Sequence, residues 1–243
     1  MVPPPGQGHN ALVTGGARRI GRALVEALSE AGAGVAIHYG ASAAEAEALA
    51  ADLTQQGRRA ATVAADLADP QAAASLLGRA EDELGPIDWL VNSASIFDPL
   101  ELESTTVEAW DRHFAINLRA PFLLSQAFAR SRAGQPGAIV NILDWRALRP
   151  ADDHFPYTIA KAGLAAMTRS LAVALAPTIR VNGVALGAIL PPSDGGGADA
   201  LKGVPAGRWG RLEDVGDTVR FLLDGPDYIT GAILHIDGGR HLV

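Results

Sequence analysis

The chain has 243 residues, of which 48% are hydrophobic and 19% charged, and its formal net charge is −7 at pH 7. This length and composition suit one globular α/β domain with a large core, and the acidic balance argues against a general nucleic-acid surface. The chain has no cysteine, which excludes disulfides and thiolate metal sites, and its six histidines show no metal-ligand spacing.

Short apolar runs alternate with longer amphipathic segments along the chain. We expect strands at residues 11–13, 35–38, 62–65, 89–92, 138–142, 179–182 and 232–236. We expect helices at about 19–33, from a capping box at 42–45 to about 56, after an N-cap at 69–70, after 105–108, at 155–176 and at about 213–223. Apolar strands alternating with helices predict a single-domain α/β fold, a Rossmann-type doubly wound parallel sheet of about seven strands with helices on both faces.

Two segments fall outside this alternation. Residues 1–10 are rich in Pro and Gly and lack a signal-peptide pattern, so we expect a flexible N-terminal tail before one domain at 11–243. Residues 190–205 form the one long irregular stretch, which is either a substrate loop or a plain surface loop. Because no apolar run reaches about 18 residues, we expect no membrane partner and a cytoplasmic location.

A tyrosine and a lysine lie four residues apart in the helix expected at 155–176. Residues at this spacing share a helix face, so the Lys161 ammonium is expected near the Tyr157 phenol. A nearby cation favours the phenolate and would lower the tyrosine pKa from about 10 towards neutrality, which suits a general acid. Asp144 follows an apolar run just upstream, so the pattern indicates a reductase with an acidic group in its active site.

A glycine-rich turn at residues 14–21 joins the first strand to the first helix. Its glycines let the backbone approach a pyrophosphate, whose charge the helix N-terminus favours. The second strand lacks the acid that would hold an NAD ribose, so NADP(H) is favoured, with Arg18, His38 and Ser42 as contacts to its 2′-phosphate. Asp66, at the end of the third strand, either accepts from the adenine amino group or caps a loop.

Together these motifs resemble the short-chain dehydrogenase/reductase family over residues 11–243. The matching motifs are the turn at Thr14, Asp66 with Leu67, residues 92–94, Asn117, Tyr157 with Lys161, and residues 229–231 and 237–239. The resemblance implies that Asn117, Tyr157 and Lys161 are catalytic, with Lys161 on the nicotinamide ribose and Asn117 holding a water. It implies a cofactor site formed by Gly15, Arg18, Arg19, Ile20, Gly21, His38, Ser42, Asp66, Leu67, Ser93, Ala94, Tyr157, Lys161 and Gly187. It also implies a homotetramer built through the helices near 106–131 and 156–176.

Four positions depart from the usual family pattern and resemble its pteridine reductase branch, as well as bacterial dihydromonapterin reductases. They are Arg19 in place of Gly, Ser93 in place of Asn, Ser95 in place of Gly, and Asp144 in place of the catalytic Ser. An ionised Asp144 would repel the oxyanion of a ketone substrate, whereas a pterin presents ring N–H groups that need an acceptor. Asp144 and Tyr157, as neighbouring acids, are expected to titrate as a pair.

The implied substrate site consists of Arg19, Ser95, Phe97, Asp144 and Tyr157. Phe97 would stack on a flat heteroaromatic ring, Ser95 would hold its polar edge, and Arg19 would bridge the cofactor phosphate and a pterin oxygen. We therefore expect an NADPH-dependent reductase of a pterin-like C=N bond, with a dihydropterin or dihydrofolate as its small-molecule substrate. The alternatives are a carbonyl reductase of the 3-oxoacyl-carrier-protein or sugar-alcohol type, and a non-catalytic NADPH-binding protein.

Overall fold

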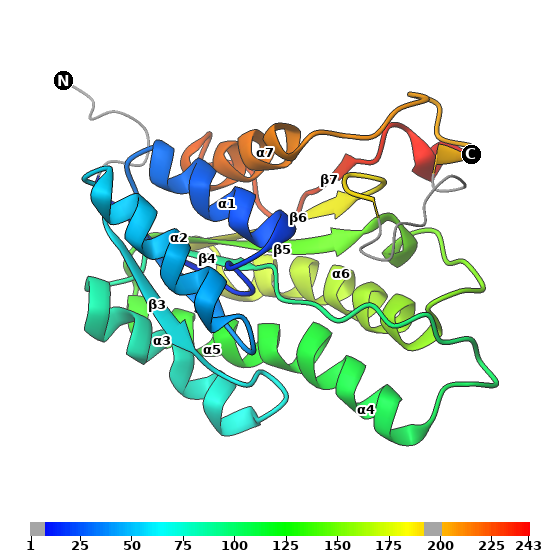
Figure 1. Ribbon diagram of the computed structural model, residues 1–243, viewed down its shortest axis with the longest axis horizontal. Helices are drawn as coiled ribbons and strands as arrows, with labels where there is room; N and C mark the ends of the chain where they lie inside the picture. The colour runs from blue at the N-terminus through cyan, green and yellow to red at the C-terminus, as the bar shows by residue number, and fades with distance from the viewer. Residues whose placement is uncertain (1–7, 192–200) are drawn as a thin grey trace.

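Seven parallel strands form the centre of the molecule (Figure 1). The computed structural model describes residues 8–191 and 201–243. The strands are β1 (Asn10–Val13), β2 (Gly34–Tyr39), β3 (Ala60–Ala64), β4 (Trp89–Asn92), β5 (Gly137–Asp144), β6 (Ile179–Leu186) and β7 (Ile233–Ile236). Their spatial order is β3-β2-β1-β4-β5-β6-β7, which confirms the predicted Rossmann-type fold. The order reverses between β1 and β4, and ligands of such sheets bind in the crevice at this reversal.

Helices cover both faces of the sheet (Figure 1). One face carries α1 (Arg19–Glu30), α2 (Ala43–Gln55) and α7 (Leu212–Asp224). The other carries α3 (Pro70–Leu84), α4 (Val107–Phe114), α5 (Ala120–Arg132) and α6 (Phe155–Leu175). The single helix expected after residues 105–108 consists of α4 and α5, joined by a π-helical turn at Ala115–Arg119. That turn contains Asn117, and such turns are frequent at functional sites.

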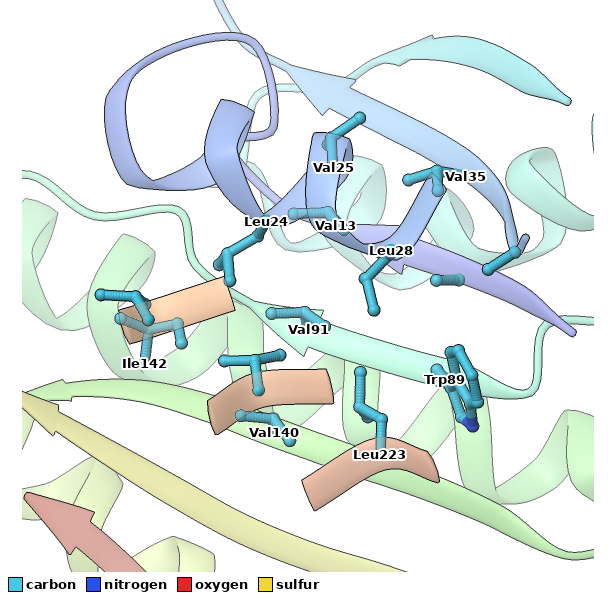
Figure 2. Packing of buried hydrophobic residues seen from close by; sticks show 14 of the residues in the cluster. Val13, Leu24, Val25, Leu28, Val35, Trp89, Val91, Val140, Ile142 and Leu223 are labelled. Atoms are coloured by element: carbon cyan, nitrogen blue, oxygen red, sulfur yellow. The ribbon is translucent and has the colours of Figure 1, made fainter. Parts of the chain in front are cut away.

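Strand side chains alternate between two hydrophobic cores, one under each helical layer. Val13 of β1 belongs to the core under α1 and α7, where it packs with Leu24 (Figure 2). The adjacent Leu12 points to the opposite face, into the core under α3 and α5 that contains Phe128. Each such side chain, fully removed from water, contributes about 1.5–3 kcal/mol. Burial on both faces is the reason that the strands are apolar throughout.

The two irregular segments differ from expectation in their limits. The tail predicted at residues 1–10 is too long, because Asn10 is the first residue of β1 and its side-chain amide donates to the carbonyl oxygens of Leu84 and Pro86 at 2.9 and 3.0 Å. Residues 1–7 lie outside the described residues. The loop predicted at 190–205 also falls largely outside them, over residues 192–200.

Two predicted helix starts have different outcomes. Asp69 caps α3 as predicted, since its carboxylate accepts from the Gln71 backbone N–H at 2.8 Å. The capping box predicted at 42–45 is wrong, because the Ser42 side chain makes no capping hydrogen bond. Glu45 instead forms an ion pair with Arg18 at 2.8 Å. The guanidinium thus takes the carboxylate that a capping box needs.

Helix α6 is long and apolar enough to cross a membrane by length and composition alone. In this fold it lies on the sheet, where Leu164 packs with Leu143 of β5 and Ala185 of β6. Its buried face also carries Tyr157 and Lys161. A helix that packs on the sheet and carries buried polar groups in this way is a core helix of a globular domain.

The central role of Phe128 can be tested by truncation. Phe128 is fully buried, so Phe128→Ala should lower the free energy of unfolding by about 3–5 kcal/mol, because it leaves a cavity in a close-packed core. Urea denaturation followed by circular dichroism measures this change. Tyr228→Ala truncates a ring that is 99% exposed and should stay within about 0.5 kcal/mol of the wild type. Equal losses in both variants would contradict this description of the core.

Candidate active site

An acid, a phenol and an ammonium meet at the carboxyl end of β5. Asp144 is the last residue of β5, and the Tyr157 hydroxyl, from the first turn of α6, donates to Asp144 Oδ2 at 3.2 Å. Lys161, one turn further along α6, donates from Nζ to the carbonyl oxygen of Ile142 at 2.7 Å. The structure therefore brings together the three groups that the sequence singles out.

Burial controls the protonation of this group. Desolvation and the neighbouring Asp144 raise the pKa of Tyr157 well above its usual value, and desolvation raises the pKa of Asp144 too. Desolvation also lowers the pKa of Lys161 to about 8. The predicted lowering of the tyrosine pKa is wrong, because the phenol bonds to a carboxylate while the ammonium bonds to a strand carbonyl. Tyr157 consequently keeps its proton at neutral pH, as a general acid must.

Arg146, which belongs to none of the sequence motifs described above, connects Asp144 to the carboxylate of Asp153. The Arg146 backbone N–H donates to Asp144 Oδ1 at 2.8 Å, and the guanidinium lies 3.7 Å from the same oxygen. The guanidinium also donates two hydrogen bonds to Asp153, at 3.0 and 2.7 Å. This two-point contact fixes the arginine so that its charge offsets that of the largely buried Asp144.

Phe97 forms an aromatic surface beside Tyr157. Its ring stacks on His154 with the centroids 3.7 Å apart and an interplanar angle of 8°. It meets the Tyr157 ring edge-on at 4.6 Å. The side chain is 47% exposed, so Phe97 is not a core residue and part of its ring is open to a flat ligand.

Asn117 holds the segment that carries Ser95 and Phe97. Its side-chain oxygen accepts from the Ile96 backbone N–H and from the Ser95 hydroxyl, both at 3.0 Å. Its side-chain nitrogen donates to the Ile96 carbonyl oxygen at 3.1 Å. Because these protein groups occupy the amide, Asn117 positions the segment that follows β4, and its predicted contact with a water stays a prediction.

The glycine-rich turn packs against the segment after β4. Gly15 has a φ of +64°, and a Cβ there would lie 2.9 Å from the Cα of Ala94, so the position requires glycine. A Cβ on Gly21 would lie 2.0 Å from the Gly15 carbonyl oxygen. Thr14 joins the glycine-rich turn to the segment after β4, because its hydroxyl oxygen accepts from the Ser93 and Ala94 N–H groups at 2.9 and 3.0 Å. Thr14 is not among the site residues predicted from the sequence.

Arg19 occupies a left-handed backbone position in the same turn, with a φ of +52°. Glycine adopts this conformation without strain, which explains why the family pattern has glycine there. The Arg19 guanidinium donates to the carbonyl oxygen of Pro191 at 2.9 Å. Arg19 thus reaches the start of the expected substrate loop, and its contacts to phosphate and pterin stay predictions.

His38, an expected contact to a 2′-phosphate, has both ring nitrogens bonded within the protein. The ring is buried, its Nδ1 accepts from the Gly15 N–H at 3.0 Å, and its Nε2 lies 3.1 Å from the Ala65 carbonyl oxygen. Burial lowers the pKa of His38 to about 4, so the ring is neutral at pH 7. Its position at the end of β2 joins the glycine-rich turn to the end of β3.

The other expected cofactor residues line the same edge of the sheet or pack beneath it. Arg18 is exposed and paired with Glu45 near Ser42, the residue before α2. The Asp66 carboxylate accepts a backbone N–H two residues further on, so it caps a turn and remains exposed. At Gly187 a Cβ would lie 2.6 Å from the Cα of Asp237. Ile20 and Leu67 pack in the two cores. Contacts of these residues to a cofactor stay predictions.

Comparisons with known proteins agree with this geometry. A family model described as enoyl-(acyl carrier protein) reductase matches residues 15–241. The chain is 37% identical to an L-xylulose reductase from Bos taurus, over 96% of each chain. The chain belongs to the short-chain dehydrogenase/reductase family. Another relative is a 3-oxoacyl-[acyl-carrier-protein] reductase from Synechocystis, which is 33% identical over 94% of this chain and 95% of that protein.

A solved structure is also close to this short-chain dehydrogenase/reductase. FolM alternative dihydrofolate reductase 1 from Brucella canis, complexed with NADP, has a TM-score of 0.92 and 40% sequence identity to it. The similarity covers 97% of this chain and 95% of the Brucella chain.

Replacing His38 should change the pH dependence of stability. Because the pKa of His38 falls from 6.5 to about 4 on folding, the unfolded chain takes up a proton between these pH values that the folded chain does not. Stability therefore falls on acidification, by about 3 kcal/mol between pH 7 and pH 4 from this residue. His38→Asn should lack this part of the slope in urea denaturation at a series of pH values. Parallel curves for the two proteins would refute the assignment.

Proposed function

We propose that this chain is an NADPH-dependent reductase of a pterin-like C=N bond, which converts a dihydropterin or dihydrofolate to the tetrahydro form. The observation that carries the proposal is the largely buried Asp144, whose Oδ2 accepts from the Tyr157 hydroxyl at 3.2 Å. Ketone reduction needs a donor here to stabilise the developing oxyanion, and a carboxylate opposes it. A pterin ring, in contrast, offers N–H groups to an acceptor. The 40% identity to the Brucella FolM enzyme supports this substrate class.

The described residues fit NADP(H) as the cofactor. The glycine-rich turn brings backbone N–H groups to the N-terminus of α1, and the first turn of α1 carries no acid. No acid ends β2, and the exposed Arg18 guanidinium stands at the start of α1, where a 2′-phosphate needs a cation. Lys161 and Tyr157 would hold the nicotinamide ribose. Bound NADPH supplies the hydride.

Tyr157 and Asp144 supply the proton in this proposal. The raised pKa of Tyr157 keeps the phenol protonated until a ring nitrogen with growing basicity lies against it. The proton leaves from the tyrosine oxygen, and the hydrogen bond to Asp144 makes the pair the titrating unit. The Lys161 ammonium, 5.7 Å from the tyrosine ring centre, offsets the negative charge left on the pair. Phe97 holds the flat ring by stacking, and Ser95 bonds its polar edge.

A carbonyl reductase is the second candidate function. The observation in its favour is that the relatives named above include an L-xylulose reductase and a 3-oxoacyl-[acyl-carrier-protein] reductase. In such an enzyme Asp144 would be protonated and would donate to the carbonyl oxygen as a serine does. Its raised pKa is compatible with that state. A non-catalytic NADPH-binding protein is a third candidate, which the intact Tyr157 and Lys161 oppose.

Asp144→Ser should distinguish these functions. We expect NADPH oxidation with 7,8-dihydrobiopterin, dihydromonapterin or dihydrofolate, and a fall in kcat of about 10²–10⁴-fold in Asp144→Ser, because the proton-sharing carboxylate is lost. With an acetoacetyl thioester or L-xylulose, the same substitution should leave turnover unchanged or raise it. NADPH absorbance in steady-state assays measures both.

The matched control is Asp152→Ser, which removes an exposed carboxylate from the same region of the chain and should keep pterin turnover. Turnover of the carbonyl substrates without pterin turnover, undiminished in Asp144→Ser, would replace the proposal with the carbonyl reductase. NADPH binding without turnover of any substrate would favour the non-catalytic protein.

Arg18 should determine the preference for NADPH over NADH. Arg18→Ala should raise the KM for NADPH and leave that for NADH nearly unchanged, because only NADPH carries the 2′-phosphate. Glu45→Gln releases the guanidinium from its ion pair with Glu45. It should lower the KM for NADPH by up to about fivefold, because an exposed ion pair contributes up to about 1 kcal/mol. Arg22→Ala, which breaks the analogous exposed pair with Glu26, is the control. Equal changes for both cofactors in Arg18→Ala would contradict this role.

We also propose that the chain acts as a homotetramer through α4, α5 and α6. A groove of about 890 Å³ lies along these helices and is lined by Leu118, Phe122 and Met167 among others. Phe122 is 44% exposed in the single chain, so a second copy would cover an apolar surface. A small-molecule substrate and a cytoplasmic location stay predictions.

A further inference from the structure

Three potential metal ligands converge at the C-terminal end of the chain, apart from the proton-transfer group. His235 lies on β7, Asp237 directly follows β7, and His241 lies in the short 3₁₀ turn Arg240–Leu242. Their ligand atoms all lie within 4.8 Å of one another. His241 Nδ1 is 2.8 Å and His235 Nδ1 3.7 Å from the same oxygen, Asp237 Oδ2. The two imidazole rings are stacked, with their centroids 3.8 Å apart.

We propose that His235, Asp237 and His241 bind one divalent transition metal ion, with Zn²⁺ as the best fit. With metal–ligand bonds of about 2.1 Å, ligand atoms 2.8 and 3.7 Å apart subtend roughly 84° and roughly 124° at the metal, on either side of the tetrahedral angle. Because a metal binds an imidazole nitrogen in the plane of the ring, the two stacked rings must also turn apart about their side-chain bonds when the ion binds. Two imidazoles with one carboxylate suit zinc, whereas magnesium and calcium prefer oxygen ligands.

The position of the His235 ring is not explained by the structural role of the C-terminal turn. The Asp237 carboxylate caps the C-terminal turn, because it accepts from the backbone N–H groups of Gly239 and His241, both at 2.9 Å. That role accounts for the aspartate but leaves out the His235 ring. Its Nδ1 is buried, has no hydrogen-bond partner and faces the carboxylate at 3.7 Å. An unpaired buried nitrogen is costly, and a metal ion would satisfy it.

A neighbouring cavity gives the ion access and room for water. It has a volume of about 330 Å³, and all three ligand residues line it. His235 and His241 remain 24% and 29% exposed, while Asp237 is 2% exposed. One cation and one further acid, Arg208 and Asp214, also line the cavity. Three protein ligands leave a fourth position of a tetrahedral ion open to solvent.

A bound ion would fasten the end of the chain to the sheet. It would join β7 to the turn that contains His241, and the Arg149 guanidinium donates to the Arg240 carbonyl oxygen of that turn at 3.2 Å. The preceding Gly238 carbonyl oxygen accepts from the Ala206 N–H at 3.0 Å, which ties the same turn to the segment after residue 201. The ion would therefore stabilise the C-terminal turn and the two segments bonded to it.

Isothermal titration calorimetry with zinc chloride tests this proposal on the full chain, freed of any polyhistidine tag and stripped with a chelator. We expect one ion per chain, and a higher midpoint of thermal unfolding when zinc is present, because an ion that binds only the folded chain stabilises it. His235→Gln loses no hydrogen bond and should still weaken binding at least about tenfold, as should His241→Gln. His9→Gln, at the opposite end of the sheet, should leave binding unchanged.

Circular dichroism and NADPH binding establish that each variant is folded. Zinc binding that is absent in the wild type would overturn the proposal, as would binding that His235→Gln and His241→Gln reduce no more than His9→Gln does. Displacement of zinc by a small excess of magnesium would also refute it, because magnesium has little affinity for imidazole ligands.

Discussion

The hydrogen bond between Tyr157 and the largely buried Asp144 is the constraint on which the active site depends. A carboxylate removed from water is costly unless hydrogen bonds and opposite charges compensate. Asp144 receives the Arg146 N–H, the Tyr157 hydroxyl, and the field of the Arg146 and Lys161 cations. The cations are held in turn, Arg146 by Asp153 and Lys161 by a strand carbonyl. Substitution of any one of these residues therefore alters the electrostatic environment of the others.

The sheet can be predicted from the sequence because its strands are buried on both faces and so appear as apolar runs between helices. The same reasoning places Asp144 at the carboxyl edge, where a ligand binds. The residues at which strands end are harder to predict from the sequence. Strand β6 continues to Leu186, beyond the expected end at residue 182, because Gly183 does not break it. A Cβ on Gly183 would lie 2.7 Å from the Leu143 side chain, so this glycine makes room for packing.

The sequence fails where a polar group finds a partner far along the chain. His38 is expected to contact a 2′-phosphate, yet its ring nitrogens bond to Gly15 and Ala65, and burial lowers its pKa and keeps it neutral. Glu45 fits a capping box, but Arg18 takes its carboxylate. In both cases the sequence pattern indicates where along the chain, and at which edge of the sheet, the residue lies. Its charge and contacts depend on neighbours that only the fold brings close.

Arg19 combines a strained backbone conformation with a long-range hydrogen bond in the glycine-rich turn. A left-handed backbone costs a residue with a side chain about 1–2 kcal/mol, and glycine would remove that cost. Glycine, however, cannot supply the guanidinium that reaches the Pro191 carbonyl oxygen at 2.9 Å. This bond joins the turn at the N-terminus of α1 to the segment that follows β6. The strained residue thus connects two segments at the crevice that lie far apart in the sequence, which a glycine at this position could not do through a side chain.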